Sequence, residues 1–363
     1  MQSPHSFVQH CLLHPANMPA LLRFFRISLL LWVGLTAIAT HAQTLRVLAW
    51  PGYADADLVR AFEQRTGLKV EVTTIDSDEQ LWARMTAREG RDFDVFAVNT
   101  AELQRYLARG LAGAIDLSRL KNLEQLQPRF RHLANIPGLV HGGHTFAIPY
   151  AYAEMGLIYD PKQWPTPPDS IHALWDPRVR GRVLMYNGGS HGFSLAALHM
   201  GKRSPFRLTS EEWAPAVDAL IALRRNVRTY YTQPEESVKQ FVRHKAALMF
   251  ANYGQQQVQL LRKAGIEVGY VLPREGALAW LDCWAVSAPS RDKPMVEAWL
   301  DFMLEKAPGQ ALIERQGLAS ASMSPTSDQD RLLWLEPVED AEKRSLMWQR
   351  IVGGAGVSKV LAP

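Results

Sequence analysis

Residues 44–110 alternate short apolar segments with helical ones, and this alternation restricts the possible folds more than any other feature of the sequence. Each apolar run is followed by a segment whose apolar residues recur at a helical spacing. Such alternation is typical of a mostly parallel sheet covered by helices. The predicted strands are Thr44–Trp50, Leu68–Ile75 and Phe93–Val98, and the predicted helices are Ala54–Thr66, Asp76–Arg88 and Leu103–Arg109.

A second pattern of the same kind follows a long extended segment at Thr145–Tyr159. Pro149 lies inside that segment, and proline is rare in central strands, so we predict a crossing between two units. A second crossing is predicted at Ala279–Ser287. The other predicted elements are the strands Val183–Tyr186, Ala246–Ala251 and Val268–Leu272 and the helices Ser190–Met200, Glu211–Arg225, Val238–Arg243, Gln255–Ala264 and Lys293–Leu304.

The length of 363 residues provides enough material for two cores. We therefore predict an α/β fold of two lobes. Each lobe is expected to be a mostly parallel sheet covered by helices, and two crossing strands are expected to join the lobes.

The first 42 residues have the pattern of a secretory signal peptide. Arg23 and Arg26 precede the apolar run Ile27–Ala39, and small residues flank a cleavage site after Ala42. The run has about 13 residues, fewer than the roughly 20 that a membrane-spanning helix needs. We predict a periplasmic protein that loses residues 1–42, with Met18 as an alternative start.

Charge, cysteine content and motifs argue against several classes of function. The formal net charge is +4 and no run of five like charges occurs, which argues against a nucleic-acid partner. Cys283 is the one cysteine after residue 42, and we expect a buried, unpaired thiol. The common motifs of hydrolases, zinc proteases and nucleotide-binding enzymes are absent, so we predict no enzymatic activity and no cofactor.

One histidine pair has the appearance of a metal site. His141 and His144 flank two glycines, and no third ligand lies nearby in the sequence. Because paired glycines are typical of tight turns, we predict a hairpin turn there and no metal.

Five local motifs lie on or beside the predicted strands and crossings. They are Trp50-Pro51-Gly52-Tyr53, Phe62–Gly67, Phe93–Phe96, Ile148-Pro149-Tyr150 and Gly276–Asp282. In this order, the motifs resemble those of the spermidine/putrescine-binding proteins of polyamine ABC importers, which have the type II periplasmic binding fold. The second and fourth motifs resemble many importer binding proteins. The Trp-x-x-Tyr motif paired with Trp-x-Asp is more specific to the polyamine branch.

The resemblance implies two lobes that close on a ligand by a hinge near residues 150 and 282. Lobe 1 would comprise residues 43–150 and 283–325, and lobe 2 would comprise residues 151–282 and 326–363, with the C-terminal helices packed on lobe 2. The resemblance further implies a monomer that binds a small amine-containing molecule and delivers it to the permease subunits of an ABC importer.

The resemblance also assigns ligand-binding side chains. Trp50, Tyr53 and Trp280 match aromatic walls, which bind an alkylamine by apolar burial and cation–π attraction. Asp282 matches the acid that anchors the amine, and such a charge-assisted hydrogen bond contributes about 1.5–3 kcal/mol. The alternatives are packing roles for the aromatic residues and a structural ion pair for Asp282.

The other end of the site departs from the family pattern. Two acids of the polyamine-binding proteins align with Gly188 and His191. Backbone N–H groups in the segment Gly188, Ser190 and His191, at a helix start, suit an anion better. We therefore predict a zwitterionic or singly charged amine, with its ammonium on Asp282, and poor binding of putrescine and spermidine.

Four further residues are candidates for the site. Asn99 and Thr100 follow the third strand, and Tyr253 follows the strand that ends at Ala251, so these three are predicted polar contacts. Glu154 on the first crossing is either a further acid of the site or a solvated side chain.

Two other functions remain open on the same fold. Tyr230-Tyr231 resembles the adjacent tyrosines of ferric-ion-binding importer proteins. In that family, however, the pair follows the strand that ends here in Ala251-Asn252, where a single Tyr253 occurs, so the sequence favours an amine over iron. A ligand-binding sensor would have the same sequence features as a transport protein.

Overall fold

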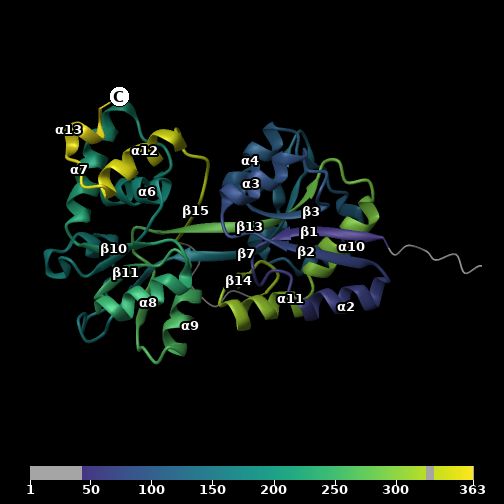
Figure 1. The fold of residues 1–363 in the computed structure, drawn as a ribbon, viewed down its shortest axis with the longest axis horizontal. Helices are drawn as coiled ribbons and strands as arrows, with labels where there is room; N and C mark the ends of the chain where they lie inside the picture. Colours follow the sequence, from purple (N-terminus) through teal and green to yellow (C-terminus); the bar gives the residue numbers. More distant parts are fainter. Residues whose placement is uncertain (1–42, 324–330, 363) are drawn as a thin grey trace, which may run out of the picture. The chain divides into compact units, whose positions relative to one another are not determined.

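The computed structural model describes residues 43–323 and 331–362. The predicted signal peptide and its cleavage after Ala42 lie outside these ranges. Within the same ranges, no helix is both long enough and apolar enough to cross a membrane. Two groups of strands are present, each flanked by helices, and the long strands β7 (Ala147–Met155) and β13 (Ala277–Ser287) run side by side (Figure 1).

The larger sheet has eight strands in the order β14-β7-β13-β3-β1-β2, with β4 and β15 also paired to β13. The first three strands of the chain are parallel, as predicted, whereas β13 is antiparallel to both β3 and β7. The predicted α/β fold is confirmed, and the sheet is mixed rather than mostly parallel. Its other strands are β1 (Thr44–Ala49), β2 (Lys69–Thr74), β3 (Val95–Asn99), β4 (Ala112–Gly113), β14 (Ala319–Ser320) and β15 (Leu332–Trp334).

The smaller sheet has five strands in the order β10-β9-β11-β8-β12. It is also mixed, because β8 is antiparallel to β11 and β12. The edge strand β10 was not predicted, since its residues are mostly half-buried and form no continuous apolar run. The strands are β8 (Leu157–Tyr159), β9 (Val183–Tyr186), β10 (Val227–Tyr231), β11 (Leu248–Phe250) and β12 (Gly269–Val271).

The paired histidines lie in a separate hairpin of β5 (Val140–His141) and β6 (His144–Thr145). Gly142 and Gly143 form its turn, with φ values of 57° and 80° that favour glycine. The predicted turn is confirmed.

Local sequence explains where several helices begin and end. Ser77 begins α3 by accepting a hydrogen bond from the N–H of Gln80 at 3.1 Å. Gly67 ends α2 with φ of 72°. The helices are α2 (Ala56–Thr66), α3 (Asp78–Ala87), α4 (Thr100–Ala108), α5 (Pro128–Arg131), α6 (Gly189–His199), α7 (Trp213–Arg224), α8 (Pro234–His244), α9 (Gln255–Lys263), α10 (Lys293–Met303), α11 (Lys306–Ala311), α12 (Ala341–Val352) and α13 (Val357–Val360).

The apolar cores follow the two sheets. Beside the larger sheet, Trp284 and Trp299 are fully buried, and the ring of Trp299 packs against both Trp284 and Phe62. In the smaller sheet, Phe193 packs against Trp213 at 5.3 Å between ring centroids. Cys283 is 1% exposed and unpaired, as predicted.

The chain passes from the larger sheet to the smaller one at Gly156, between β7 and β8. A Cβ at residue 156 would lie 2.5 Å from the carbonyl oxygen of Val271, so glycine permits a close approach there. Both β7 and β13 belong to the larger sheet over their full length. The division into lobes at residues 150 and 282 therefore stays a prediction.

The C-terminal helix α12 packs against α6 of the smaller-sheet region (Figure 1). Its Arg344 is fully buried, donates to the carbonyl of Ser190 and the hydroxyl of Ser194, and pairs with Glu339 at 2.8 Å. A Cβ at Gly192 would lie 2.5 Å from the Trp348 ring. This glycine therefore allows α12 to approach α6.

We predict that Gly192→Ala lowers the free energy of unfolding by about 1–2 kcal/mol. Overpacking costs about 1–3 kcal/mol, and improved helix propensity offsets at most about 1 kcal/mol. The Trp348 ring resists displacement because its N–H donates to Asn187 Oδ1 at 2.9 Å. Urea denaturation measures the difference. Gly356→Ala is the control, because residue 356 has an ordinary φ of −83° and open space around it; equal stability of the two variants would contradict the close packing.

Candidate ligand-binding site

Asp282 and Tyr53, both predicted site residues, form a buried pair. The hydroxyl of Tyr53 donates to Asp282 Oδ2 at 2.6 Å, and the two residues are 2% and 7% exposed. Burial raises the pKa of the Asp282 carboxyl to about 7, although the hydrogen bond from Tyr53 lowers it. Among the described residues, no lysine or arginine forms an ion pair with Asp282, so the alternative of a structural ion pair is wrong.

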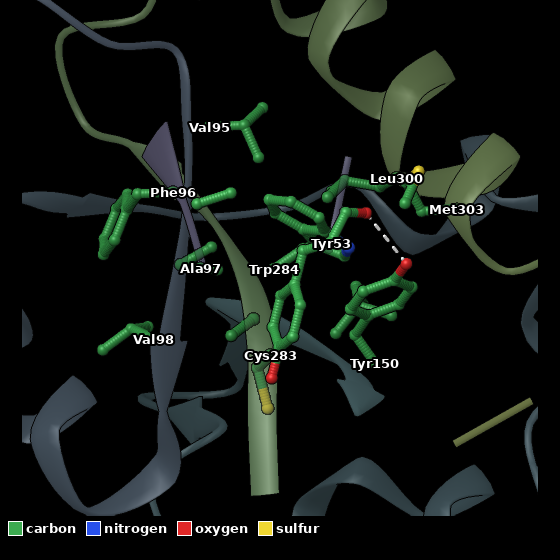
Figure 2. Packing of buried hydrophobic residues seen from close by; sticks show 14 of the residues in the cluster. Tyr53, Val95, Phe96, Ala97, Val98, Tyr150, Cys283, Trp284, Leu300 and Met303 are labelled. Atoms are coloured by element: carbon green, nitrogen blue, oxygen red, sulfur yellow. Dashed lines mark hydrogen bonds between the residues drawn. The ribbon is translucent and has the colours of Figure 1, made fainter. Parts of the chain in front are cut away.

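The position of Tyr53 is fixed from three sides. Gly52 has φ of 82°, and the turn it forms lets the N–H of Tyr53 bond to the carbonyl of Trp50 at 3.2 Å. Figure 2 shows the Tyr53 ring packed beside Tyr150 and Trp284, at centroid distances of 5.3 and 6.3 Å. The hydroxyl of Tyr150 donates to the carbonyl of Tyr53 at 3.0 Å. The hydroxyl that binds Asp282 is therefore held by a rigid aromatic cluster.

Asn99 lies beside this pair, because it is directly opposite Asp282 in the antiparallel register of β3 and β13. Its Oδ1 accepts a hydrogen bond from the N–H of Glu102 at 2.9 Å, which starts α4 earlier than predicted. Its Nδ2 donates to Asp78 Oδ1 at 3.3 Å. Asn99 thus connects Asp282 to a second acid.

Asp78, at the start of α3, is an acid that the sequence analysis did not assign to the site. Burial and the negative charges of Glu102 and Asp282 together raise the pKa of its carboxyl to about 8. Arg105 opposes this shift only in part. The signal available in the sequence was topological, because the carboxyl ends of β1, β2 and β3 meet at one edge of the parallel part of the sheet.

Trp280 and Tyr253 connect this region to the smaller sheet. The indole N–H of Trp280 donates to the carbonyl of Asn252 at 3.0 Å, next to Tyr253. The hydroxyl of Tyr253 donates to the carbonyl of Thr232 at 2.7 Å. Burial raises the pKa of Tyr253, and the charge of Asp78 contributes, so these two side chains lie within electrostatic range of each other.

Tyr186 at the end of β9 is a second residue that the sequence analysis missed. Its ring lies 5.1 Å from that of His191 and 6.2 Å from that of Tyr253. Burial and the charge of Asp78 raise the pKa of Tyr186 to about 12. Tyr186 therefore links the predicted residue His191 to the acidic part of the site.

The segment from Gly188 to His191 begins α6, one residue before the predicted helix start at Ser190, and its binding of an anion stays a prediction. Burial and the nearby charge of Arg344 lower the pKa of His191 to about 4, so this side chain is neutral at pH 7. A Cβ at Gly189 would lie 2.8 Å from the carbonyl oxygen of Arg344, and Ser190 accepts a hydrogen bond from Arg344 through its carbonyl. Packing against α12 thus explains the glycine at 189 without a bound anion.

The remaining predicted residues differ in their surroundings. Trp50 is half-buried, and its indole N–H finds no hydrogen-bond partner in the described part of the chain. Thr100 is 4% exposed as the first residue of α4. Glu154 is 6% exposed on β7, so the alternative of a solvated side chain is wrong.

The tyrosine pair considered for iron has another role. The hydroxyl of Tyr231 donates to the carbonyl of Phe250 at 2.6 Å and accepts from the N–H of Asn252 at 3.0 Å. Tyr230 packs its ring against Trp348. In residues 43–323 and 331–362, no group of three or more histidine, cysteine or acidic side chains is arranged to hold a metal ion.

Comparison with known proteins places the chain in a family. The model of the bacterial extracellular solute-binding proteins matches residues 57–330. The putrescine-binding periplasmic protein PotF of Escherichia coli is 25% identical over 294 residues, which cover 76% of this chain and 77% of that protein. The norspermidine sensor of Vibrio cholerae is 25% identical over 306 residues, which cover 82% and 79% of the two chains.

The fold is also similar to that of solved structures. The spermidine/putrescine ABC transporter substrate-binding protein PotD of Streptococcus pneumoniae superposes with a TM-score of 0.72 at 19% identity, covering 88% of this chain and 99% of that one. Because the family model matches well over half of the sequence, the chain belongs to the bacterial extracellular solute-binding proteins.

Proposed function

We propose that the protein captures a small solute with at least one ammonium group outside the cytoplasmic membrane and delivers it to the permease subunits of an ABC importer. Membership of the extracellular solute-binding family supports the capture role, and the putrescine-binding relative supports an amine as the solute. On this proposal the protein acts by binding and release, and no catalytic group is required.

The observation that carries the proposal is the state of Asp282. A carboxylate with 7% exposure is costly to ionise unless a cation or several donors compensate it. Among the residues that the structure describes, the neutral hydroxyl of Tyr53 is the one side-chain group that donates a hydrogen bond to it. An ammonium group would supply the missing positive charge and a charge-assisted hydrogen bond.

The aromatic residues suit the rest of such a ligand. Trp50 and Trp280 both lie at the edge of the larger core as half-buried side chains. Tyr186 and Tyr253 line the smaller-sheet side near the acids. Aromatic faces bind alkyl chains by apolar burial and attract an ammonium group through the ring quadrupole. The predicted role of Trp50, Tyr253 and Trp280 as ligand contacts is part of this proposal.

A sensor is the second candidate function. The norspermidine sensor of Vibrio cholerae is as similar in identity as the putrescine-binding protein. Both roles use the same ligand-binding step and differ in the membrane partner. Co-purification with a permease or with a receptor distinguishes them.

We predict that amines stabilise the purified mature protein against heat. A ligand at 100 times its dissociation constant adds about 2.7 kcal/mol to the free energy of unfolding, which raises the melting temperature by several degrees. A thermal-shift screen of mono- and diamines, amino acids and sugars measures this. Stabilisation by sugars or simple carboxylates but by no amine would refute the proposed solute class.

We predict that Asp282→Asn weakens binding of the amine found in that screen by about 1.5–3 kcal/mol, or roughly 10- to 150-fold. Asparagine keeps the size and can still bond to Tyr53, but it lacks the negative charge. Titration calorimetry measures the affinity. Asp169→Asn is the control, because Asp169 is 76% exposed and pairs with Arg274 at the surface. Equal affinity of the wild type and Asp282→Asn would show that Asp282 does not bind the ligand.

We predict that the mature protein is a monomer whose radius of gyration decreases on binding. The reason is the expected hinge closure at the two crossing strands. Small-angle scattering with and without saturating amine measures both mass and radius. A constant radius would contradict two lobes that move, and a doubled mass would contradict the monomer.

A further inference from the structure

We propose that Asp78 is a second ligand-binding carboxylate, which makes the site select a solute with two ammonium groups over one with an ammonium and a carboxylate. The inference rests on the proposed function, because it adds a residue to the same site. It reverses the sequence-based expectation of a zwitterion, which counted Asp282 as the single anchoring acid.

The two acids are neighbours across one side chain. Asn99 and Asp282 are directly opposite on antiparallel strands, so their side chains share a face and their Cβ atoms are about 5 Å apart. Asn99 Nδ2 reaches Asp78 Oδ1 at 3.3 Å. Asn99 therefore neighbours both acids, and the charge of Asp282 reaches Asp78 and helps to raise its pKa.

Neither acid forms an ion pair with a lysine or arginine in the described part of the chain, although the charge of Arg105 acts on Asp78 from nearby. Arg105, the nearest guanidinium, donates to the backbone carbonyl of Asp78 at 3.1 Å and pairs its charge with Glu102 at 2.5 Å. Asp282 is nine-tenths buried and bonds to a neutral hydroxyl. Two neighbouring acids without an ion-pair partner are suited to a ligand that carries two positive charges.

The charged and titratable groups around Asp78 reinforce this interpretation. Acids outnumber bases among them, and burial keeps the tyrosines neutral at pH 7. The groups are Glu79 on α3, Glu102, Arg105 and Tyr106 on α4, Asp282 on β13, and Tyr186 and Tyr253 beside the smaller sheet.

A role in the helix dipole is the structural alternative for Asp78. An acid in the first turn of a helix is stabilised in its charged form, which lowers its pKa. Here the surroundings act in the opposite direction and raise the pKa of Asp78 to about 8. Ser77 already caps α3. The helix end therefore does not account for the placement of Asp78.

The test uses three probes of equal chain length: 1,4-diaminobutane, 4-aminobutanoate and 1-aminobutane. Titration calorimetry compares the wild type with two variants, Asp78→Asn and Asp78→Ser. Serine is used as the second replacement because it is also favoured at the start of a helix. Asp76→Asn is the matched control, because Asp76 is exposed in the same loop. Circular dichroism establishes that each variant is folded.

We expect the wild type to bind 1,4-diaminobutane more tightly than 4-aminobutanoate, because the carboxylate of the latter would be repelled by Asp78. Both Asp78 variants should bind the diamine about 10- to 100-fold more weakly. Their affinity for 1-aminobutane should change by less than about threefold, since a single ammonium group needs only Asp282. Asp76→Asn should bind all three probes as the wild type does.

Proton release gives a readout that a purely structural role would not alter. The pKa values of about 8 for Asp78 and 7 for Asp282 mean that both carboxyls are partly protonated at pH 7. A bound dication favours the ionised forms, so binding expels protons and affinity rises with pH up to about 8. Titrations at pH 7 in buffers of different ionisation enthalpy should show release by the wild type and less release by Asp78→Asn.

Three outcomes would overturn the inference: unchanged diamine affinity in folded Asp78 variants, tighter binding of 4-aminobutanoate than of the diamine, or equal proton release by wild type and Asp78→Asn. In each case the proposed function survives if Asp282→Asn still weakens amine binding. If no amine binds the wild type, the proposed function fails as well, and the two failures are therefore distinguishable.

Discussion

The buried hydrogen bond between Tyr53 and Asp282 is the interaction on which the rest of the site depends. It joins the turn after β1 to the long strand β13, and the rings of Tyr150 and Trp284 leave Tyr53 little freedom. One oxygen of the carboxylate is thereby fixed without being neutralised. A binding protein benefits from this arrangement, because the acid is oriented before the ligand arrives and little ordering remains to be done on binding.

The same arrangement has a cost in stability. The pKa values of Asp78 and Asp282 are raised above those of the unfolded chain, so the folded state binds more protons than the unfolded state between about pH 4 and 8. Their contribution to stability is therefore fully present below about pH 4 and is lost as the pH rises through 7 and 8. On the proposed function, a cationic ligand offsets this loss, which couples ligand binding to folding stability at neutral pH.

The sequence predicted the fold well because strand and helix patterns are local. It indicated Tyr53 and Asp282 as candidates because each lies in a short motif beside a strand, and the structure brings these two residues together. Asp78 was missed because its importance depends on Asn99 and Asp282, which are distant in the sequence and meet only in the sheet. For a related reason the sequence could not show that the glycines of α6 pack against α12, since that helix lies about 150 residues further along the chain.

The two sheets contribute different chemistry to the site. The acids Asp78 and Asp282 belong to the larger-sheet region. The smaller-sheet side offers Tyr186, Tyr253 and a neutral His191, and the charge of Arg344 nearby is balanced by Glu339. On the proposed function, charge selection resides on one side, while neutral aromatic surfaces on the other side discriminate by shape and apolar contact. Substitutions among the aromatic residues can then alter the preferred length of the ligand without altering its required charge.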